Sequence, residues 1–290
     1  MLKVTKDFDN PPAVLLTKGR LNKIQKAVDT QSAQHISNSD YSPALAKDAL
    51  EALYHAKCSY CESTVLQVAA LQVEHYRPKN GVLEAPNHKG YYWLAVEWSN
   101  LVLGCPNCNG QGAKGNKFPV LANRVMAQNP FETGQFSRAG ILANVSPLLD
   151  EAPLLLHPEI DDPKLHLKYD GFGLLKGKTK RGKGTIEICN LNRDALYAER
   201  QTIVNYFLKQ CNIIFLGKLT YNLANEVVDA FLIEQLKLLK AHWDDLKKPY
   251  TAFVGYVLEN PTTCLYPSIE AAFKTDFKRA FAKFRRQELR

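Results

Sequence analysis

The sequence predicts an α+β protein in which a zinc-braced module is followed by a mostly α-helical C-terminal region. Three observations lead to this prediction. Two Cys-x-x-Cys pairs, "CSYC" at 58–61 and "CPNC" at 105–108, have the spacing of zinc knuckles. Apolar runs beside the pairs are short and typical of strands. Beyond residue 184, apolar residues recur three and four positions apart, as on one face of a helix.

Composition and charge set the broad class. Of the 290 residues, 46% are hydrophobic and 23% are charged, so a packed globular core is expected. Residues 1–14 are too polar for a signal peptide and no stretch is long and apolar enough for a membrane span, so we expect a cytoplasmic protein without membrane contact. The net charge of +8 suits a polyanionic partner such as nucleic acid, and residues 274–290 alone carry a net +5.

The chain begins with an N-terminal extension, residues 1–39, which is expected to be partly irregular with one basic helical piece. A firmer helix is predicted within "DYSPALAKDALEALYHA", residues 40–56, with Ser42 as its N-cap and Pro43 at the first helical position. Because this helix leads directly into the first cysteine pair, it would anchor the zinc site.

The zinc-braced module is predicted over residues 40–125. Residues 126–183 form a predicted connecting region with turn signals and a basic, glycine-punctuated loop, "KGKTKRGK", which is either a nucleic-acid clamp or a surface loop. This region includes an acidic turn, flanked by His157 and His166, that is expected to be a solvated loop rather than a second metal site. The helical region is predicted over residues 184–290.

Two faces are predicted for the helices of the C-terminal region. In the helix expected near 225–248, residues including Val227, Phe231 and Leu239 have the spacing of an apolar face. In the last helix a stripe of aromatic side chains is expected to face the core or a partner: Phe273, Phe277, Phe281 and Phe284.

The four cysteines of the two pairs, Cys58, Cys61, Cys105 and Cys108, are predicted to bind one structural Zn²⁺. Two thiolates three residues apart can bind one tetrahedral ion from a single tight turn, and two such turns complete the shell. Coincidence and a redox Cys-x-x-Cys motif are the alternatives. Because 43 residues separate the pairs, a folded segment must lie between them. A closed shell of four thiolates leaves no position for chemistry.

A second site is suggested by four polar residues near the cysteine pairs, Glu74, His75, Asn100 and Asn109. If residues 73–76 and 101–104 pair as antiparallel strands, the zinc ion would hold the strand ends together. A helix starting near the second cysteine pair would then pack across the strands. That arrangement would bring the four side chains to one small site.

The chemistry of such a site suits phosphodiester hydrolysis. A carboxylate and an amide oxygen are hard ligands for Mg²⁺ or another divalent cation, and a neutral imidazole can take a proton from water near neutral pH. An adjacent acid and histidine alone would more often be a surface pair, and the zinc frame favours the catalytic interpretation. Basic residues that could hold flanking phosphates lie nearby: Arg77, Lys79, Lys114 and Lys117.

The stretches "VEHYRPK" (73–79), "EWSNLVLGCPNCN" (97–109) and "KGNKFP" (114–119) together resemble the HNH nuclease motif, the ββα-metal fold with a zinc-knuckle brace. Within that superfamily the chain resembles the HNH subunit of Septu-type antiviral systems, including the version carried beside retrons. The resemblance covers roughly residues 40–200. Two features depart from it: Glu74 stands where most motifs have Asp, and the four residues "GQGA" separate "CN" from "KG" where two are usual.

The resemblance implies a role for each site residue and a partner. It implies that His75 is the general base and that Asn100 positions it. Glu74 and Asn109 would be the ligands of the catalytic Mg²⁺ or other divalent cation. The partner would be an ABC/SMC-type ATPase subunit that controls the nuclease.

The leading hypothesis is therefore a metal-dependent HNH endonuclease that hydrolyses phosphodiester bonds of DNA in antiviral defence. Two alternatives stay open. The chain could be the effector of a retron-type system that cleaves RNA such as tRNA. It could also be a zinc-braced nucleic-acid-binding module whose catalytic residues are vestigial.

Overall fold

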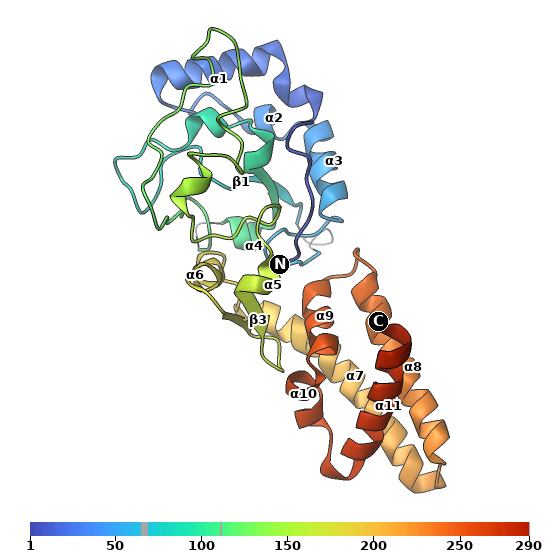
Figure 1. Ribbon diagram of the computed structural model, residues 1–290. Coiled ribbons are helices and arrows are strands. Elements are labelled where there is room, and N and C mark those ends of the chain that lie inside the picture. Colours follow the sequence, from blue (N-terminus) through green and yellow to red (C-terminus); the bar gives the residue numbers. More distant parts are fainter. Residues whose placement is uncertain (65–68, 111, 290) are drawn as a thin grey trace. The chain divides into compact units, whose positions relative to one another are not determined.

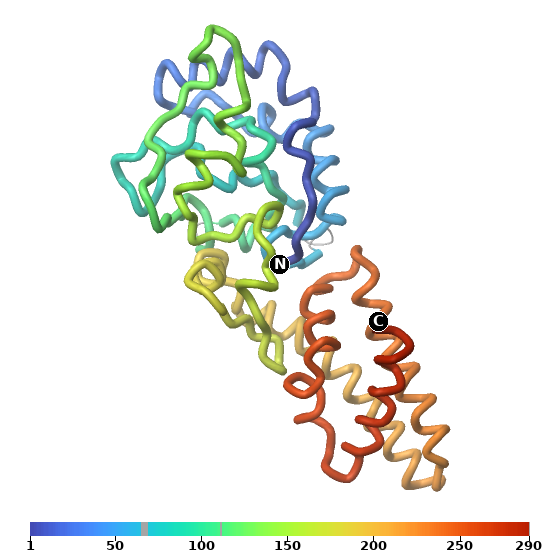
Figure 2. Tube along the Cα trace, viewed as in Figure 1, coloured from blue at the N-terminus to red at the C-terminus, as the bar shows by residue number. Residues whose placement is uncertain are grey.

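The structure, a computed structural model, describes residues 1–64, 69–110 and 112–289, and the chain divides into two compact units (Figure 1, Figure 2). The first unit comprises Met1–Leu167 and Gly177–Leu191, and the second comprises Lys168–Lys176 and Asn192–Arg290. The predicted mixture of helices and strands is confirmed. In the ranges that the structure describes, no helix combines the length and the apolar character needed to cross a membrane.

The described part of the first unit contains mostly short helices, one two-stranded sheet and long irregular segments, such as residues 112–148, which Figure 2 traces in green. In chain order its elements are η1 (Ala13–Leu16), α1 (Lys18–Thr30), α2 (Asn38–Tyr41), α3 (Ala44–Leu53), β1 (Gln72–His75), η2 (Tyr92–Leu94), η3 (Trp98–Asn100), β2 (Leu101–Gly104), α4 (Pro106–Asn109), η4 (Leu149–Glu151), α5 (Pro163–His166) and α6 (Lys180–Ile188).

The predicted pairing of two strands around the candidate site is confirmed. β1 pairs antiparallel with β2, in a register that runs from Gln72 opposite Gly104 to His75 opposite Leu101. One further backbone hydrogen bond, from Tyr76 N to Asn100 O at 2.8 Å, continues the pairing past β1. Every strand residue except Gln72 is buried, so the register is fixed by packing on both faces.

The helix that leads into the first cysteine pair is α3, and it packs against β2. It begins one residue later than predicted: Pro43 is its N-cap, and Ser42 instead closes α2 by donating its N–H to Asn38 O at 2.8 Å. Ala46 and Leu50 form its buried face. The helix before the cysteine loop is therefore held in place by its packing against β2, and not by a serine N-cap.

The prediction of a loop over residues 176–183 is wrong at both ends, because Lys176 and Gly177 belong to the strand Leu175–Gly177 and Lys180–Ile188 is helix α6. Thr179 caps this helix, its side-chain oxygen accepting a hydrogen bond from Gly182 N at 3.1 Å. A Cβ on Gly182 would stand 2.1 Å from the carbonyl oxygen of His166, so only glycine allows this close approach. Tertiary packing thus offsets the low helix propensity of glycine.

The acidic turn after His157 is partly buried: Glu159 is buried, whereas Asp161 and Asp162 have intermediate exposure, so the prediction of a solvated loop is wrong at Glu159. Glu159 accepts a hydrogen bond from the Lys6 ammonium at 3.0 Å, and the same ammonium donates to the carbonyl oxygen of Leu101 at 2.5 Å. The imidazole of His157 meets Ser99 O at 3.1 Å through Nε2, and burial lowers its pKa. The turn therefore braces η3 and the start of β2.

The second unit is mainly helical. The two-stranded sheet of β3 (Leu167–Tyr169) and β4 (Leu175–Gly177) lies where the chain passes between the units. The remaining elements are α7 (Asp194–Tyr221), α8 (Asn225–Asp244), α9 (Thr251–Glu259), α10 (Pro261–Cys264), η5 (Tyr266–Ser268), η6 (Ala271–Phe273) and α11 (Lys274–Glu288). Helix α8 packs against α7, α9 and α11 (Figure 1).

The aromatic stripe predicted for the last helix is confirmed as core, since all four of its phenylalanines are buried. The face predicted for α8 is only partly right. Its buried residues are Asp229 and the apolar Val228, Leu232, Leu236 and Leu239, whereas Val227 and Phe231 remain 39% and 51% exposed. The buried face is therefore rotated by one residue from the predicted one, because α8 is contacted by three helices and not by a single surface.

We predict that Phe277→Ala destabilises the second unit by about 3–5 kcal/mol, the usual cost of removing a buried aromatic ring. Phe277 is fully buried and its ring contacts Phe207, Tyr266 and Phe281. Phe231→Ala is the matched control, because that ring is half exposed and its loss should change stability by only about 0.5 kcal/mol. Urea unfolding of the full chain, followed by circular dichroism, measures both; equal losses would contradict the assignment of the core.

Candidate functional site

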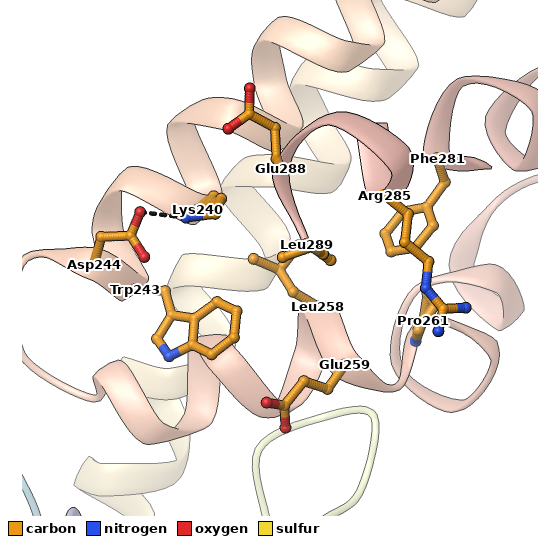
Figure 3. A pocket seen from close by; sticks show the side chains of 10 residues that line it. All are labelled: Lys240, Trp243, Asp244, Leu258, Glu259, Pro261, Phe281, Arg285, Glu288 and Leu289. Atoms are coloured by element: carbon orange, nitrogen blue, oxygen red, sulfur yellow. Dashed lines mark hydrogen bonds and ion pairs between the residues drawn. The ribbon is translucent and has the colours of Figure 1, made fainter. Parts of the chain in front are cut away.

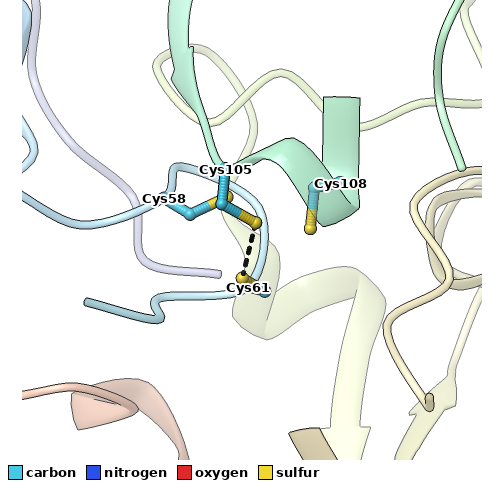
Figure 4. Close-up of side chains that lie close together, drawn as sticks. All are labelled: Cys58, Cys61, Cys105 and Cys108. Atoms are coloured by element: carbon cyan, nitrogen blue, oxygen red, sulfur yellow. Dashed lines mark hydrogen bonds between the residues drawn. The ribbon is translucent and has the colours of Figure 1, made fainter. Parts of the chain in front are cut away.

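The four cysteines of the two pairs form a buried cluster (Figure 4). Their sulfur atoms all lie within 4.8 Å of one another, and Sγ of Cys61 is 3.8 Å from Sγ of Cys105. Cys58 and Cys61 come from the loop after α3, Cys105 directly follows β2, and Cys108 lies in α4. The loop is also tied to the strand, since Ser59 N donates to Leu103 O at 2.8 Å.

This arrangement fits a tetrahedral metal ion such as zinc, for which four thiolates are a complete set of ligands. Burial raises the pKa of the Cys58 thiol, because a buried anion without a cation is unfavourable. A bound cation would reverse that preference and hold all four sulfurs as thiolates. The cluster therefore has the composition and burial of a structural metal site, with no position left for a substrate.

Glu74 and Asn109 are brought together at the end of β2 nearest the cysteines. A Cβ on Gly104 would stand 3.5 Å from Cβ of Glu74 and 3.6 Å from Cβ of Asn109, so both side chains flank the same point. The amide nitrogen of Asn109 donates to Oε1 of Gln72 at 2.9 Å. Its amide oxygen is therefore the atom that could bind a cation. Burial raises the pKa of Glu74, and the neighbouring Lys114 ammonium opposes that shift.

His75 is held as a neutral imidazole with a defined tautomer. Its Nε2 lies 2.9 Å from the carbonyl oxygen of Ala95, and because a carbonyl only accepts, Nε2 must carry the proton. Nδ1 is then the basic atom. Burial lowers the pKa of His75 to about 3, so the ring stays neutral at physiological pH. The ring of Tyr41 packs edge-on against it, with 4.4 Å between the ring centroids.

No hydrogen bond joins Asn100 to the His75 ring among the described residues; the Asn100 side chain instead fixes the backbone at Arg77 and at Leu94. Its Oδ1 accepts from Arg77 N at 2.8 Å, and its Nδ2 donates to Arg77 O at 3.0 Å and to Leu94 O at 3.3 Å. These bonds tie the chain after β1 to the turn that presents the Ala95 carbonyl. Asn100 therefore fixes two backbone positions: Arg77, which lies two residues after His75, and Leu94, which directly precedes the acceptor Ala95.

Two of the four basic residues expected at flanking phosphates are not accessible in this structure. Arg77 is buried, with Nε 2.8 Å from Oε2 of Glu151, and Lys114 is buried against Glu74. Neither presents its charge to solvent, because each neutralises a buried carboxylate. Lys79 and Lys117 are partly exposed and remain near the site in sequence. Burial lowers the pKa of Lys79, and the Glu74 carboxylate opposes this shift.

Sequence reasoning missed two residues of this site, Gln72 and Tyr41, and gave a third, Lys114, a different role. Gln72 could have been found, because residues two apart on a strand share one face and Glu74 is two positions on. Tyr41 carries no such signal, since its contact with His75 depends on how α2 packs. The role of Lys114 as a partner of Glu74 was hidden because a lysine beside glycines in a basic stretch favours a surface interpretation.

A pocket elsewhere does not include any of these residues. It has a volume of about 460 Å³ and lies in the second unit between α8, α9 and α11, with Trp243, Leu258 and Phe281 among its lining residues (Figure 3). Its charged residues include Lys240 and Asp244, which pair with each other. The residues of the predicted site lie instead on β1, η3 and α4.

The chain is similar to proteins that are named as Septu proteins. No protein-family model matches it. It is 31% identical to the Septu protein PtuB of Bacillus mycoides (strain KBAB4) over 169 residues, 56% of this chain and 52% of that protein. It is also 31% identical to the Septu protein PtuA of the same strain over 209 residues, 69% of this chain and 27% of that protein. Identity to the Septu protein PtuB of Bacillus thuringiensis is 28% over 182 residues, 62% of this chain and 54% of that protein.

These similarities support the Septu resemblance predicted from the sequence. The chain spans about half the length of the two PtuB proteins and about a quarter of PtuA.

We predict that purified protein contains about one zinc ion per chain, bound by the cysteine cluster. Cys105→Ser should abolish this zinc and lower the melting temperature, because a structural ion contributes folding free energy directly. Cys264→Ser, at a buried cysteine outside the cluster, should retain the metal. The measurement is the zinc content of the wild type and of both variants. Equal zinc levels in the two variants would mean that the ion is bound elsewhere.

Proposed function

We propose that the chain is a metal-dependent HNH endonuclease that hydrolyses phosphodiester bonds of DNA as the effector of an antiviral defence complex. The observation that carries this proposal is the pairing of β1 with β2 beside the cysteine cluster. This pairing brings Glu74 and Asn109 together, and the next residue along β1 is the neutral, oriented His75. An imidazole base beside hard oxygen ligands is the minimum set for metal-assisted hydrolysis of a phosphodiester.

In this proposal His75 takes the proton from the attacking water at Nδ1. The hydrogen bond from Nε2 to Ala95 O keeps the proton on the far side of the ring and so leaves Nδ1 basic. The edge-on contact with Tyr41 holds the plane of the ring. Asn100 acts through the backbone, because it fixes the turn that carries the acceptor carbonyl.

Glu74 and Asn109 would hold the divalent cation. When bound, such a cation supplies Lewis-acid stabilisation of the charge that develops on the phosphate. Among the predicted phosphate contacts, Lys79 and Lys117 are the two whose side chains are partly exposed. We therefore assign the flanking phosphates to these two lysines.

A partner is also part of the proposal. The chain is similar to two differently named Septu proteins of the same strain, PtuA and PtuB, and this supports a role in a multi-component system. We propose that an ABC/SMC-type ATPase subunit controls the nuclease, since an unrestrained endonuclease would damage its host. Nucleic acid is the second proposed partner, and the net charge of +8 supports it.

We predict that His75→Ala lowers the rate of Mg²⁺-dependent nicking of plasmid DNA by about 10²-fold or more, the usual contribution of a general base. His88→Ala is a matched control: it too is a buried histidine whose Nε2 meets a carbonyl oxygen at 2.9 Å, that of Val125. This control should keep its activity.

Equal nicking by both variants would overturn the role of His75. The assay includes tRNA as a second substrate and the ATPase subunit, if one co-purifies. Cleavage of tRNA alone would move the substrate to RNA, and binding of DNA without turnover by the wild type would favour a non-catalytic module.

We further predict an unusual pH profile for the nicking rate. A base with the ordinary histidine pKa of 6.5 would lose about tenfold in rate for each pH unit below that value. Because burial lowers the pKa of His75 to about 3, the base form persists and no such fall should occur between pH 7 and pH 5. Single-turnover rates with zinc content checked at each pH measure this; a fall with a midpoint near 6.5 would contradict the buried, neutral state of His75.

A further inference from the structure

Lys114 lies inside the candidate catalytic site with its ammonium surrounded by oxygen atoms. Its Nζ is 2.5 Å from Oε1 of Glu74, 2.7 Å from the carbonyl oxygen of His75 and 3.3 Å from that of Gly115. The residue is fully buried. A positive charge among a carboxylate and two carbonyls occupies the kind of position that a hard cation takes in proteins.

The backbone fixes Lys114 to the second cysteine pair. Lys114 N donates to Cys108 O at 3.1 Å, and Gly115 N donates to Asn109 O at 3.1 Å. These two bonds close the loop that contains the extra residues of "GQGA", of which residue 111 lies outside the described ranges. The same loop therefore places both the proposed ligand Asn109 and the Lys114 ammonium against Glu74.

A divalent cation and this ammonium would need the same carboxylate. Oε1 of Glu74 is engaged at 2.5 Å, and bringing a doubly charged ion within a few ångströms of an ammonium in a buried site is strongly unfavourable. Lys114 has a four-carbon stem with several rotatable bonds, so the ammonium can leave by rotation without moving the backbone.

We propose that the Lys114 ammonium occupies the cation position of the candidate catalytic site, and that a divalent cation binds only by displacing it. Lys114 is thus a built-in competitor for the metal: it neutralises Glu74 in the metal-free protein and sets the cation concentration at which the site fills. This inference rests on the proposed function only in requiring that Glu74 binds a divalent cation.

The test is Mn²⁺ binding to the full-length, zinc-loaded protein, followed by the electron paramagnetic resonance signal of free Mn²⁺. Lys114→Met keeps the length and apolar character of the stem but removes the charge. It should bind Mn²⁺ roughly tenfold to a hundredfold more tightly than the wild type. In the wild type the ion must first break the ion pair between Lys114 and Glu74, and in the variant this pair is absent. Lys117→Met is the matched control for loss of a nearby positive charge, and its affinity should change by only about twofold.

Two results would overturn the inference in distinguishable ways. If the wild type binds Mn²⁺ and Glu74→Gln abolishes binding, but Lys114→Met binds no more tightly than the wild type, then Lys114 does not compete and the metal site stands. If no variant binds Mn²⁺, then the metal site fails and the inference fails with it.

A second measurement uses the wild type and does not depend on the stability of a variant. Acetic anhydride acetylates accessible lysines, and mass spectrometry reports each one. Lys114 should be protected in the metal-free protein and become labelled when Mn²⁺ is added, whereas Lys117 should be labelled equally in both. Protection of Lys114 that Mn²⁺ leaves unchanged would overturn the displacement.

Discussion

The cysteine cluster is the constraint on which the arrangement of the candidate site depends. It joins the loop after α3 to the end of β2, and the bond from Ser59 N to Leu103 O adds a direct link to the strand. Two residues of the candidate site are held by the second cysteine pair: Asn109 directly follows Cys108, and Lys114 N donates to the Cys108 carbonyl oxygen. A metal in the cluster would therefore stabilise the candidate site from outside it, by holding these residues in place.

Charge inside the first unit is paired rather than excluded. Three buried ion pairs are attached to the two strands: Lys114 with Glu74 on β1, Arg77 with Glu151 directly after β1, and Lys6 with Glu159 beside the start of β2. Burying ions is costly unless each finds its partner, and removing one member of such a pair costs about 3–5 kcal/mol. The pairs at Arg77 and Lys6 join segments that are far apart in the chain and so serve the fold. The pair at Glu74 is the one that shares its carboxylate with a proposed function.

The sequence was sufficient for features that depend on local spacing. The cysteine pairs, the two strands and the phenylalanine stripe of α11 all follow from residues two, three or four positions apart. Features that depend on packing were not predictable. Helix α6 forms where Gly182 lies close to the His166 carbonyl oxygen, and the buried face of α8 differs from the predicted one because three helices contact α8. In the site, the roles of Arg77 and Lys114 were misjudged for the same reason. A basic side chain is predicted to be exposed unless the buried carboxylate that pairs with it is known. For Arg77 that carboxylate belongs to Glu151, which lies 74 residues away in the chain.

Backbone hydrogen bonds tie Asn109 and Lys114 to the second cysteine pair. Lys114 N donates to Cys108 O at 3.1 Å, and Gly115 N donates to Asn109 O at 3.1 Å. These bonds therefore fix the positions of both Asn109 and Lys114 relative to the cysteine cluster. Exchange of an ammonium for a divalent cation at Glu74 then needs only rotation of one side chain, while the strand pairing that orients His75 stays intact.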